Sequence, residues 1–220
     1  LINLFTQNEN HLIRSACLAF LHQIIESGWE SFSIEIQNAI KDLVFSLFSV
    51  NVEIEFIQKI CSIAGTIYSK DSGQWDQLVA LILDNWQTNP FIASQLLVSI
   101  IDDSFWEINE NSEDFAQRFL EMDSFFITNP ETPIHIAGLQ IISSIIGSIT
   151  GYDELPNFIN MAIQIAINSA GPNYTPNDFT TIWNSISAIM TNLSSIEGQE
   201  ELPEISELLN QMTQTAIQIA

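Results

Sequence analysis

Apolar residues recur every three or four positions through most of this chain, which is the spacing of an amphipathic helix. The stretch 131–151 shows the pattern clearly. Its apolar stripe consists of Ile134, Ala137, Ile141, Ile145 and Ile149, widened by Ile142 and Ile146. Isoleucine and threonine favour strands, but that preference depends strongly on packing context. Strict alternation of apolar and polar residues fails at both Ile-Ile pairs, so the stretch is predicted to be a helix.

The ends and the polar side of this helix can also be predicted. Thr132 and Pro133 are expected at the N-cap and the first helical position, where the missing N–H of proline leaves nothing unsatisfied. The helix is expected to end near Gly151. Small uncharged residues occupy its other side, namely Gln140, Ser143, Ser144, Gly147 and Ser148. We therefore expect an apolar ridge on one side and a smooth polar surface on the other.

The same periodicity predicts helices along the rest of the chain and no credible set of strands. The expected ranges are 1–8, 11–27, 33–49, 52–69, 74–88, 90–103, 112–128, 132–150, 154–169, 177–195 and 200–219. Short breakers such as Asp71-Ser72-Gly73 and Asn129-Pro130 separate them. The predicted fold class is all-α, with the helices arranged in pairs.

The second helices of the pairs begin near residues 11, 52, 90, 132 and 177, a recurrence of about forty residues that is typical of HEAT or armadillo repeats. A tetratricopeptide period of about 34 fits worse. Because one helix pair cannot bury both apolar faces alone, the pairs are expected to stack into a right-handed α-α superhelix of about five HEAT repeats. The expected repeats of this single array are 1–28, 29–70, 71–104, 105–151, 152–196 and part of one at 197–220. The chain is expected to be a fragment of a longer solenoid.

The charge of the chain bears on its partners. It contains 27 Asp and Glu against five Lys and Arg, a formal net charge of −22, and residues 119–220 contain no Lys or Arg. Such a charge repels nucleic acid and anionic lipid and attracts basic proteins. Solubility alone is an equally acceptable explanation, because net charge does not determine fold.

Membrane segments, disulfides and catalytic motifs are not evident. Cys17 and Cys61 lie within apolar helical stretches and are expected to be packing residues in a reducing compartment. No signal peptide or membrane-spanning run is visible, so no membrane insertion is expected. His11, His22 and His135 lack partners at metal-ligand spacing. The chain contains no phosphate-binding loop, so we predict no enzyme activity, metal or cofactor.

Three stretches resemble the N-terminal HEAT repeats of the importin-β (karyopherin-β) family. They are RSACLAFLHQIIESGWESFSIEIQNAIKDLVFSLF at 14–48, QWDQLVALILDNWQTNPFIASQLLVSI at 74–100, and IHIAGLQIISSIIG at 134–147. The importin-5-like receptors are the most similar branch. Asp76 stands where the family usually has a proline after the tryptophan, and basic residues common in such receptors are scarce.

The resemblance implies a nuclear transport receptor segment that shuttles between cytoplasm and nucleus. Such receptors bind the GTP form of Ran, basic protein cargo and phenylalanine-glycine (FG) nucleoporins. Partner-binding residues are expected on the concave face, where small polar side chains let another chain approach. These candidates are Arg14, Glu26, Ser94, Gln95, Ser99, Asp102, Asp103, Gln140 and Ser144. Asp102 and Asp103 stand out, because acids are disfavoured at the C-terminal end of a helix. An alternative function is a HEAT scaffold subunit of another complex, of the phosphatase type.

Overall fold

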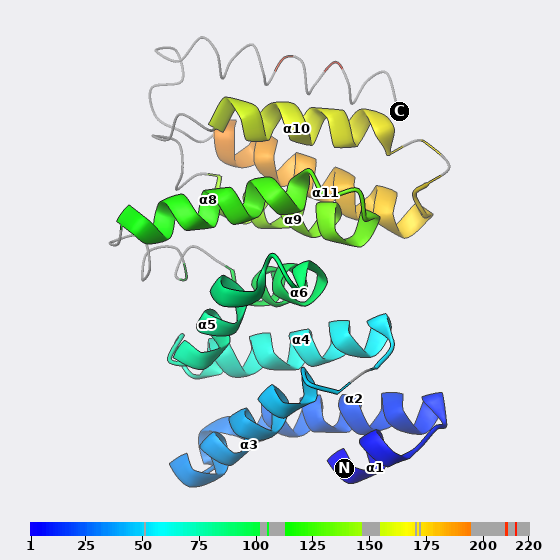
Figure 1. Ribbon diagram of the computed structural model, residues 1–220, viewed down its shortest axis with the longest axis vertical. Helices are drawn as coiled ribbons and strands as arrows, with labels where there is room; N and C mark the ends of the chain where they lie inside the picture. The colour runs from blue at the N-terminus through cyan, green and yellow to red at the C-terminus, as the bar shows by residue number, and fades with distance from the viewer. Residues whose placement is uncertain are drawn as a thin grey trace. The chain divides into compact units, whose positions relative to one another are not determined.

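The structure is a computed structural model that describes residues 1–50, 52–101, 105, 113–146, 155–169, 171, 173–194, 210 and 214. Every regular element within these residues is helical, which confirms the predicted all-α class (Figure 1). The chain divides into two compact units, Leu1–Ile100 and Ile101–Ala220, which are described separately. Asp102 and Asp103, and nearly all of the helix predicted over 200–219, lie outside the described residues.

The first unit consists of three helix pairs. Its elements are α1 (Ile2–Gln7), α2 (His11–Gly28), the 3₁₀ helix η1 (Trp29–Ser31), α3 (Ile34–Leu47), α4 (Ile54–Lys70), α5 (Asp76–Asn85) and α6 (Pro90–Ile100). Asn10 caps α2, because its side-chain oxygen accepts hydrogen bonds from the backbone N–H groups of Leu12 and Ile13 at 3.0 and 3.3 Å. After α4 the chain turns through Ser72 and Gly73, whose φ angles are 53° and 78°.

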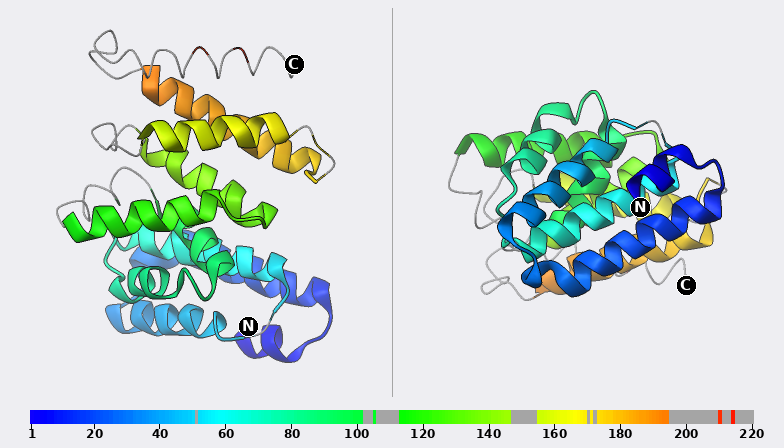
Figure 2. Two further views of the ribbon diagram at one scale, coloured as in Figure 1. Left: turned by 45° about the horizontal axis from the view of Figure 1, so that its top comes forward. Right: turned by 90° about the horizontal axis from the view of Figure 1, so that it is seen from below.

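The second helices of the three pairs lie in a row. Helix α4 packs between α2 and α6, while α1, α3 and α5 each pack on the second helix of their own pair (Figure 1 and Figure 2). The contact faces are apolar: Leu18, Ile60, Ile67 and Leu96 are buried, as the helical spacing requires. Each helix pair therefore buries its apolar faces partly against the neighbouring pair.

The second unit has two described pairs, formed by α8 (Glu113–Ile127) with α9 (Thr132–Ile145) and by α10 (Leu155–Asn168) with α11 (Pro176–Ser194). Helix α9 packs on α8 and α11, and α10 packs on α11 and α8. Each pair in both units falls within one of the predicted repeats. The repeat boundaries and the single array stay predictions.

The isoleucine ridge of α9 is buried as predicted through Ile146, while Ile149 and the predicted helix end near Gly151 lie outside the described residues. Ile141, Ile142 and Ile145 have no exposed surface, and Ile134 has 1%. Gly138 allows α9 to approach the end of α8, since a Cβ there would lie 2.6 Å from the backbone nitrogen of Ile127. The predicted N-cap was wrong by one residue: Thr132 is already helical, the N-cap is Glu131, and Pro133 lies within the first turn, where it removes no helical hydrogen bond.

Other core predictions are confirmed by burial. Cys17 and Cys61 are free thiols in the core. Burial raises the pKa of the Cys61 thiol, as expected for a packing residue. Trp29 and Trp75 are buried as well. None of the described helices is both long enough and apolar enough to span a bilayer.

Candidate functional site

The contact between α2 and α4 carries polar pairs along one edge. They are His11 with Glu55, Lys59 with Ser15 at 2.6 Å, and His22 with Thr66 at 2.8 Å. All three pairs join residues 44 positions apart in the sequence. A constant separation in sequence shows that the two helices run parallel and stay in register with each other along the contact. We call this set, with Gln58 and Gln95, the polar edge.

Arg14, a predicted partner-binding residue, is largely engaged inside the first unit. Its guanidinium donates to Glu53 Oε2 at 2.7 Å, and its Cζ lies 4.9 Å and 4.3 Å from the ring centroids of Phe5 and Phe56. Only 13% of the side chain is exposed. A backbone hydrogen bond, followed by the charge of Arg14, lowers the pKa of Glu53. Arg14 therefore joins α1, α2 and α4, and little of it remains for a partner.

The other candidates of the first unit differ in exposure. Glu26 is exposed on α2, and Gln95 is half-buried on α6, where it accepts a hydrogen bond from Gln58 Nε2 at 3.4 Å. Ser99 is half-buried and donates to the backbone oxygen of Gln95 at 2.9 Å. The prediction that Ser94 lies at the partner-binding surface was wrong. Ser94 has no exposed surface, and its hydroxyl donates to the Phe91 carbonyl within the same helix at 3.1 Å.

In the second unit, the two remaining candidates lie one turn apart on α9. Gln140 is half-buried and Ser144 is exposed. The hydroxyls of Ser143 and Ser144 both donate to the Gln140 carbonyl, at 2.7 and 3.1 Å, so they are satisfied within the helix. Ser143 itself is buried, and its carbonyl accepts from Asn192 of α11 at 3.2 Å. Gln140 and Ser144 therefore form a small polar surface.

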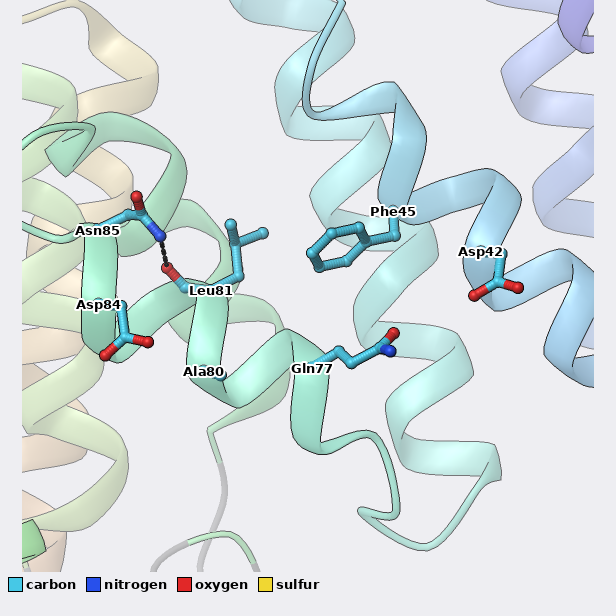
Figure 3. A pocket seen from close by; sticks show the side chains of 7 residues that line it. All are labelled: Asp42, Phe45, Gln77, Ala80, Leu81, Asp84 and Asn85. Atoms are coloured by element: carbon cyan, nitrogen blue, oxygen red, sulfur yellow. Dashed lines mark hydrogen bonds between the residues drawn. The ribbon is translucent and has the colours of Figure 1, made fainter.

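A groove between α3 and α5 was not located by the sequence analysis. It has a volume of about 470 Å³, and its lining residues are Asp42 and Phe45 of α3 with Gln77, Ala80, Leu81, Asp84 and Asn85 of α5 (Figure 3). The α5 residues have the spacing of one helical face over about 12 Å. Figure 3 shows Phe45 and Leu81 pointing toward each other from the two helices. Leu81 is half-buried, beside the fully buried Leu78 and Ile82.

The charged residues at this groove are acidic. Asp42 and Asp84 are exposed and come from opposite walls. Lys41, the cation next to Asp42 in the sequence, forms an ion pair with Asp71 and donates to the Gln74 carbonyl at 3.1 Å. Its charge is therefore directed to the turn between α4 and α5. The groove combines an apolar floor with two carboxylates on its rim.

His135 is held by two neighbours. Its Nδ1 lies 3.2 Å from the Asn129 carbonyl, and its Nε2 lies 3.0 Å from the Tyr174 hydroxyl. Burial lowers the pKa of His135, against opposing contributions from the Asn129 carbonyl and the Asp178 charge. No group of His, Cys, Asp and Glu among the described residues could hold a metal ion. The contacts of His135 link two loops of the second unit.

Comparison with known proteins returned no matching family model, no matching curated protein and no matching solved structure. The resemblance to the importin-β family stays a prediction. The packing of the helix pairs, the polar edge and the acidic groove are the features of this chain that bear on its function.

Proposed function

We propose that this chain is a protein-binding segment of a nuclear transport receptor of the importin-β type. In this proposal the helix pairs form a right-handed solenoid of about five HEAT repeats that binds Ran in its GTP form, basic cargo and FG nucleoporins, without enzyme activity. The observation that carries the proposal is that α2, α4 and α6, the second helices of their pairs, lie side by side, with the polar edge along α2 and α4.

The polar edge suits contact with another folded protein. Ser62 of α4 is exposed and lies one helical turn after Lys59 and one turn before Thr66. Short hydroxyl side chains present little bulk, so the backbone of a partner could lie close to the helices. Because α2 and α4 keep one register from His11 to His22, such a partner would meet a regular surface rather than a single pocket.

The charge of the chain supports the cargo part of the proposal. A net charge of −22 draws basic proteins toward the surface from several ångströms away. An exposed ion pair contributes typically under about 1 kcal/mol, so the summed field should matter more than any one contact. Binding of basic cargo is therefore expected to weaken steeply as salt is raised, since the Debye length falls to about 8 Å at physiological ionic strength.

The test is a pull-down of purified Ran, loaded with GTP or with GDP, by the full 220-residue chain. We expect clear retention of the GTP form and little of the GDP form. Ser62→Trp places a bulky ring on the polar edge and should weaken retention at least about tenfold. Ser46→Trp, at an exposed position of α3, is the matched control and should leave retention unchanged. Equal binding of both nucleotide forms, or none, would rule out the transport proposal.

A scaffold subunit of the phosphatase type is the alternative. The same row of helices would support it, because stacked pairs offer an extended surface to any partner. Nucleotide dependence separates the two functions. A scaffold would bind its partner equally with or without Ran, and Ser62→Trp would impair that contact without any effect of GTP.

A further inference from the structure

We propose that one face of α2 binds a second copy of this chain, with the two α2 helices antiparallel and Ala16 at the centre of the contact. The face consists of Leu12, Ile13, Ala16, Ala19 and Phe20, all of them exposed, and we call it the outer face of α2. It shares no residue with the polar edge. The contact does not depend on the transport function.

Helix α2 is apolar on two sides. Its buried side carries Leu18, Leu21 and Ile25. The other side is the outer face, where Leu12 is 77% exposed and Phe20 is 54% exposed. At about 100° per residue, the five residues of the outer face fall within about 120° of the helix circumference. An uncharged apolar stripe of that width is typical of a helix face that packs on a neighbour.

The outer face stands where the row of second helices could continue. Helix α4 is buried on both sides because it lies between α2 and α6. Among the described helices of the first unit, α4 is the only second helix that packs on α2, and the right-hand view of Figure 2 shows α2 along the near side of that unit. A helix on the outer face would therefore extend the packing that α2 already has with α4.

The distribution of charge favours a second copy as the occupant. Glu9 and Arg14 are the only Asp, Glu, Lys or Arg residues in 1–25, so the formal charge of −22 arises from the rest of the chain. Two copies can approach through their outer faces without bringing like charges together, whereas their acidic remainders repel each other. A basic partner would find no carboxylate on the outer face. A second copy presents a face that is equally apolar and uncharged.

The order of large and small side chains on the outer face is self-complementary. In an antiparallel pair with two-fold symmetry, residues equally distant from Ala16 meet across the contact. Leu12 then lies against Phe20 of the second copy, and Ile13 lies against Ala19. The two Ala16 methyl groups face each other at the centre, which lets the helix axes approach to about 8 Å.

The first experiment measures the mass of the full chain by light scattering over a range of concentrations. We expect the mass to rise toward twice the chain mass of 24.7 kDa. The dimer should become at least about threefold tighter when salt is raised tenfold, because salt screens the repulsion between two acidic chains. A chain that stays monomeric at about 200 μM would overturn the proposal and leave the outer face to a different protein.

Two double variants test the antiparallel pairing. Leu12→Glu with Phe20→Glu places acid opposite acid and should weaken the dimer at least about tenfold. Leu12→Lys with Phe20→Glu places a lysine opposite each glutamate and should dimerise at least about fivefold more tightly than the first variant. Ile167→Glu, at an exposed apolar residue of the second unit, is the control and should leave the dimer unchanged. Circular dichroism verifies that each variant is folded.

A cross-linking experiment tests the centre of the contact. Ala16→Cys should form a disulfide between two copies on mild oxidation, because its Cβ would lie near that of the second copy. Ser27→Cys, exposed on the same helix, should form little, and the native Cys17 and Cys61 are buried. Equal cross-linking of the two variants, equal weakening by the two double variants, or a dimer unaffected by Leu12→Glu with Phe20→Glu would overturn the proposal.

Discussion

Gly65 of α4 lies against the backbone of Ser99 of α6, so closely that a Cβ at Gly65 would overlap the Ser99 carbonyl oxygen and lie 2.9 Å from its carbonyl carbon. The neighbour is backbone, which cannot move aside as a flexible side chain can. The contact between α4 and α6 therefore depends on the absence of a side chain at this position.

Gly65→Ala should destabilise the first unit, although alanine favours helices by up to about 1 kcal/mol over glycine. Overpacking against the Ser99 backbone is expected to outweigh that gain and lower the free energy of unfolding by about 1–3 kcal/mol. Thermal melting measures the change. Gly28→Ala is the control, since its Cβ would meet only the ring of Phe32, at 2.9 Å, and should shift the melting temperature less. A melting temperature that rises in Gly65→Ala would contradict the packing described here.

Ile141→Asp should unfold the second unit. Ile141 has no exposed surface and lies in the ridge that α9 buries against its neighbours. A carboxylate there would be buried without a partner, and we expect a loss of about 4 kcal/mol or more. Ser144→Asp, an exposed position one turn away, should lower stability by less than about 1 kcal/mol. Urea unfolding curves of the two variants distinguish these outcomes, and similar curves would refute the burial of the ridge.

Asp123→Asn should stabilise the second unit at neutral pH. Asp123 has no exposed surface, and neither carboxyl oxygen has a hydrogen-bond partner. Burial raises the pKa of Asp123 well above its usual value of 3.8. Above that usual value the unfolded chain ionises while the folded chain keeps its proton, so stability falls as pH rises, by about 1.4 kcal/mol per pH unit up to the folded pKa. The variant carries no such ionisable group.

The measurement is the melting temperature of Asp123→Asn and of the unaltered chain between pH 3 and pH 8. The melting temperature of the variant should exceed that of the unaltered chain only slightly near pH 3, where Asp123 is protonated in the folded and in the unfolded chain. The difference should grow as the pH rises. Glu121→Gln, at an exposed position on the same helix, should show no such growth. A constant difference across the pH range would mean that Asp123 is ionised in the folded protein.

Arg14→Lys should lower stability although it keeps the positive charge. The planar guanidinium lies near both Phe5 and Phe56 and donates to Glu53, an arrangement that a lysine ammonium cannot reproduce. The expected loss is about 1–2 kcal/mol, because the group is mostly buried. Glu53→Gln, whose side chain is 60% exposed, should lower stability less than Arg14→Lys does. Chemical denaturation followed by tryptophan fluorescence provides both values.

Helical periodicity was sufficient to predict the α-helices that the structure describes, because they bury apolar residues at helical spacing, whereas the 3₁₀ helix η1 was not predicted. It also contained a signal for Asp123 that the sequence analysis did not use. Asp123 stands at helical spacing among Phe119, Met122 and Phe126, all of them buried. An acid on the apolar face of a helix is a recognisable exception, and the pattern alone indicates a buried carboxyl.

The surface residues were harder to predict, for two physical reasons. Ser94 was expected at the surface because it is polar, but a hydroxyl that donates to a carbonyl of its own helix can be buried at little loss. The groove depends on Phe45 and Leu81, which belong to different helix pairs. Whether these two side chains face each other is decided by how α3 and α5 lie, and no local spacing encodes that.

The separation of 44 residues between α2 and α4 differs from those between the other described second helices: Gln58 meets Gln95 after 37 residues, and Ser143 meets Asn192 after 49. Neighbouring second helices thus pair through chain segments of unequal length, and the connections absorb the difference. Lengthening a loop adds only a small entropic cost to folding. Insertions in the turn at Asp71–Gln74 should therefore be tolerated. A single extra residue inside α4, in contrast, would rotate every following side chain of that helix by about 100°. Related sequences could drift in spacing while preserving the same architecture.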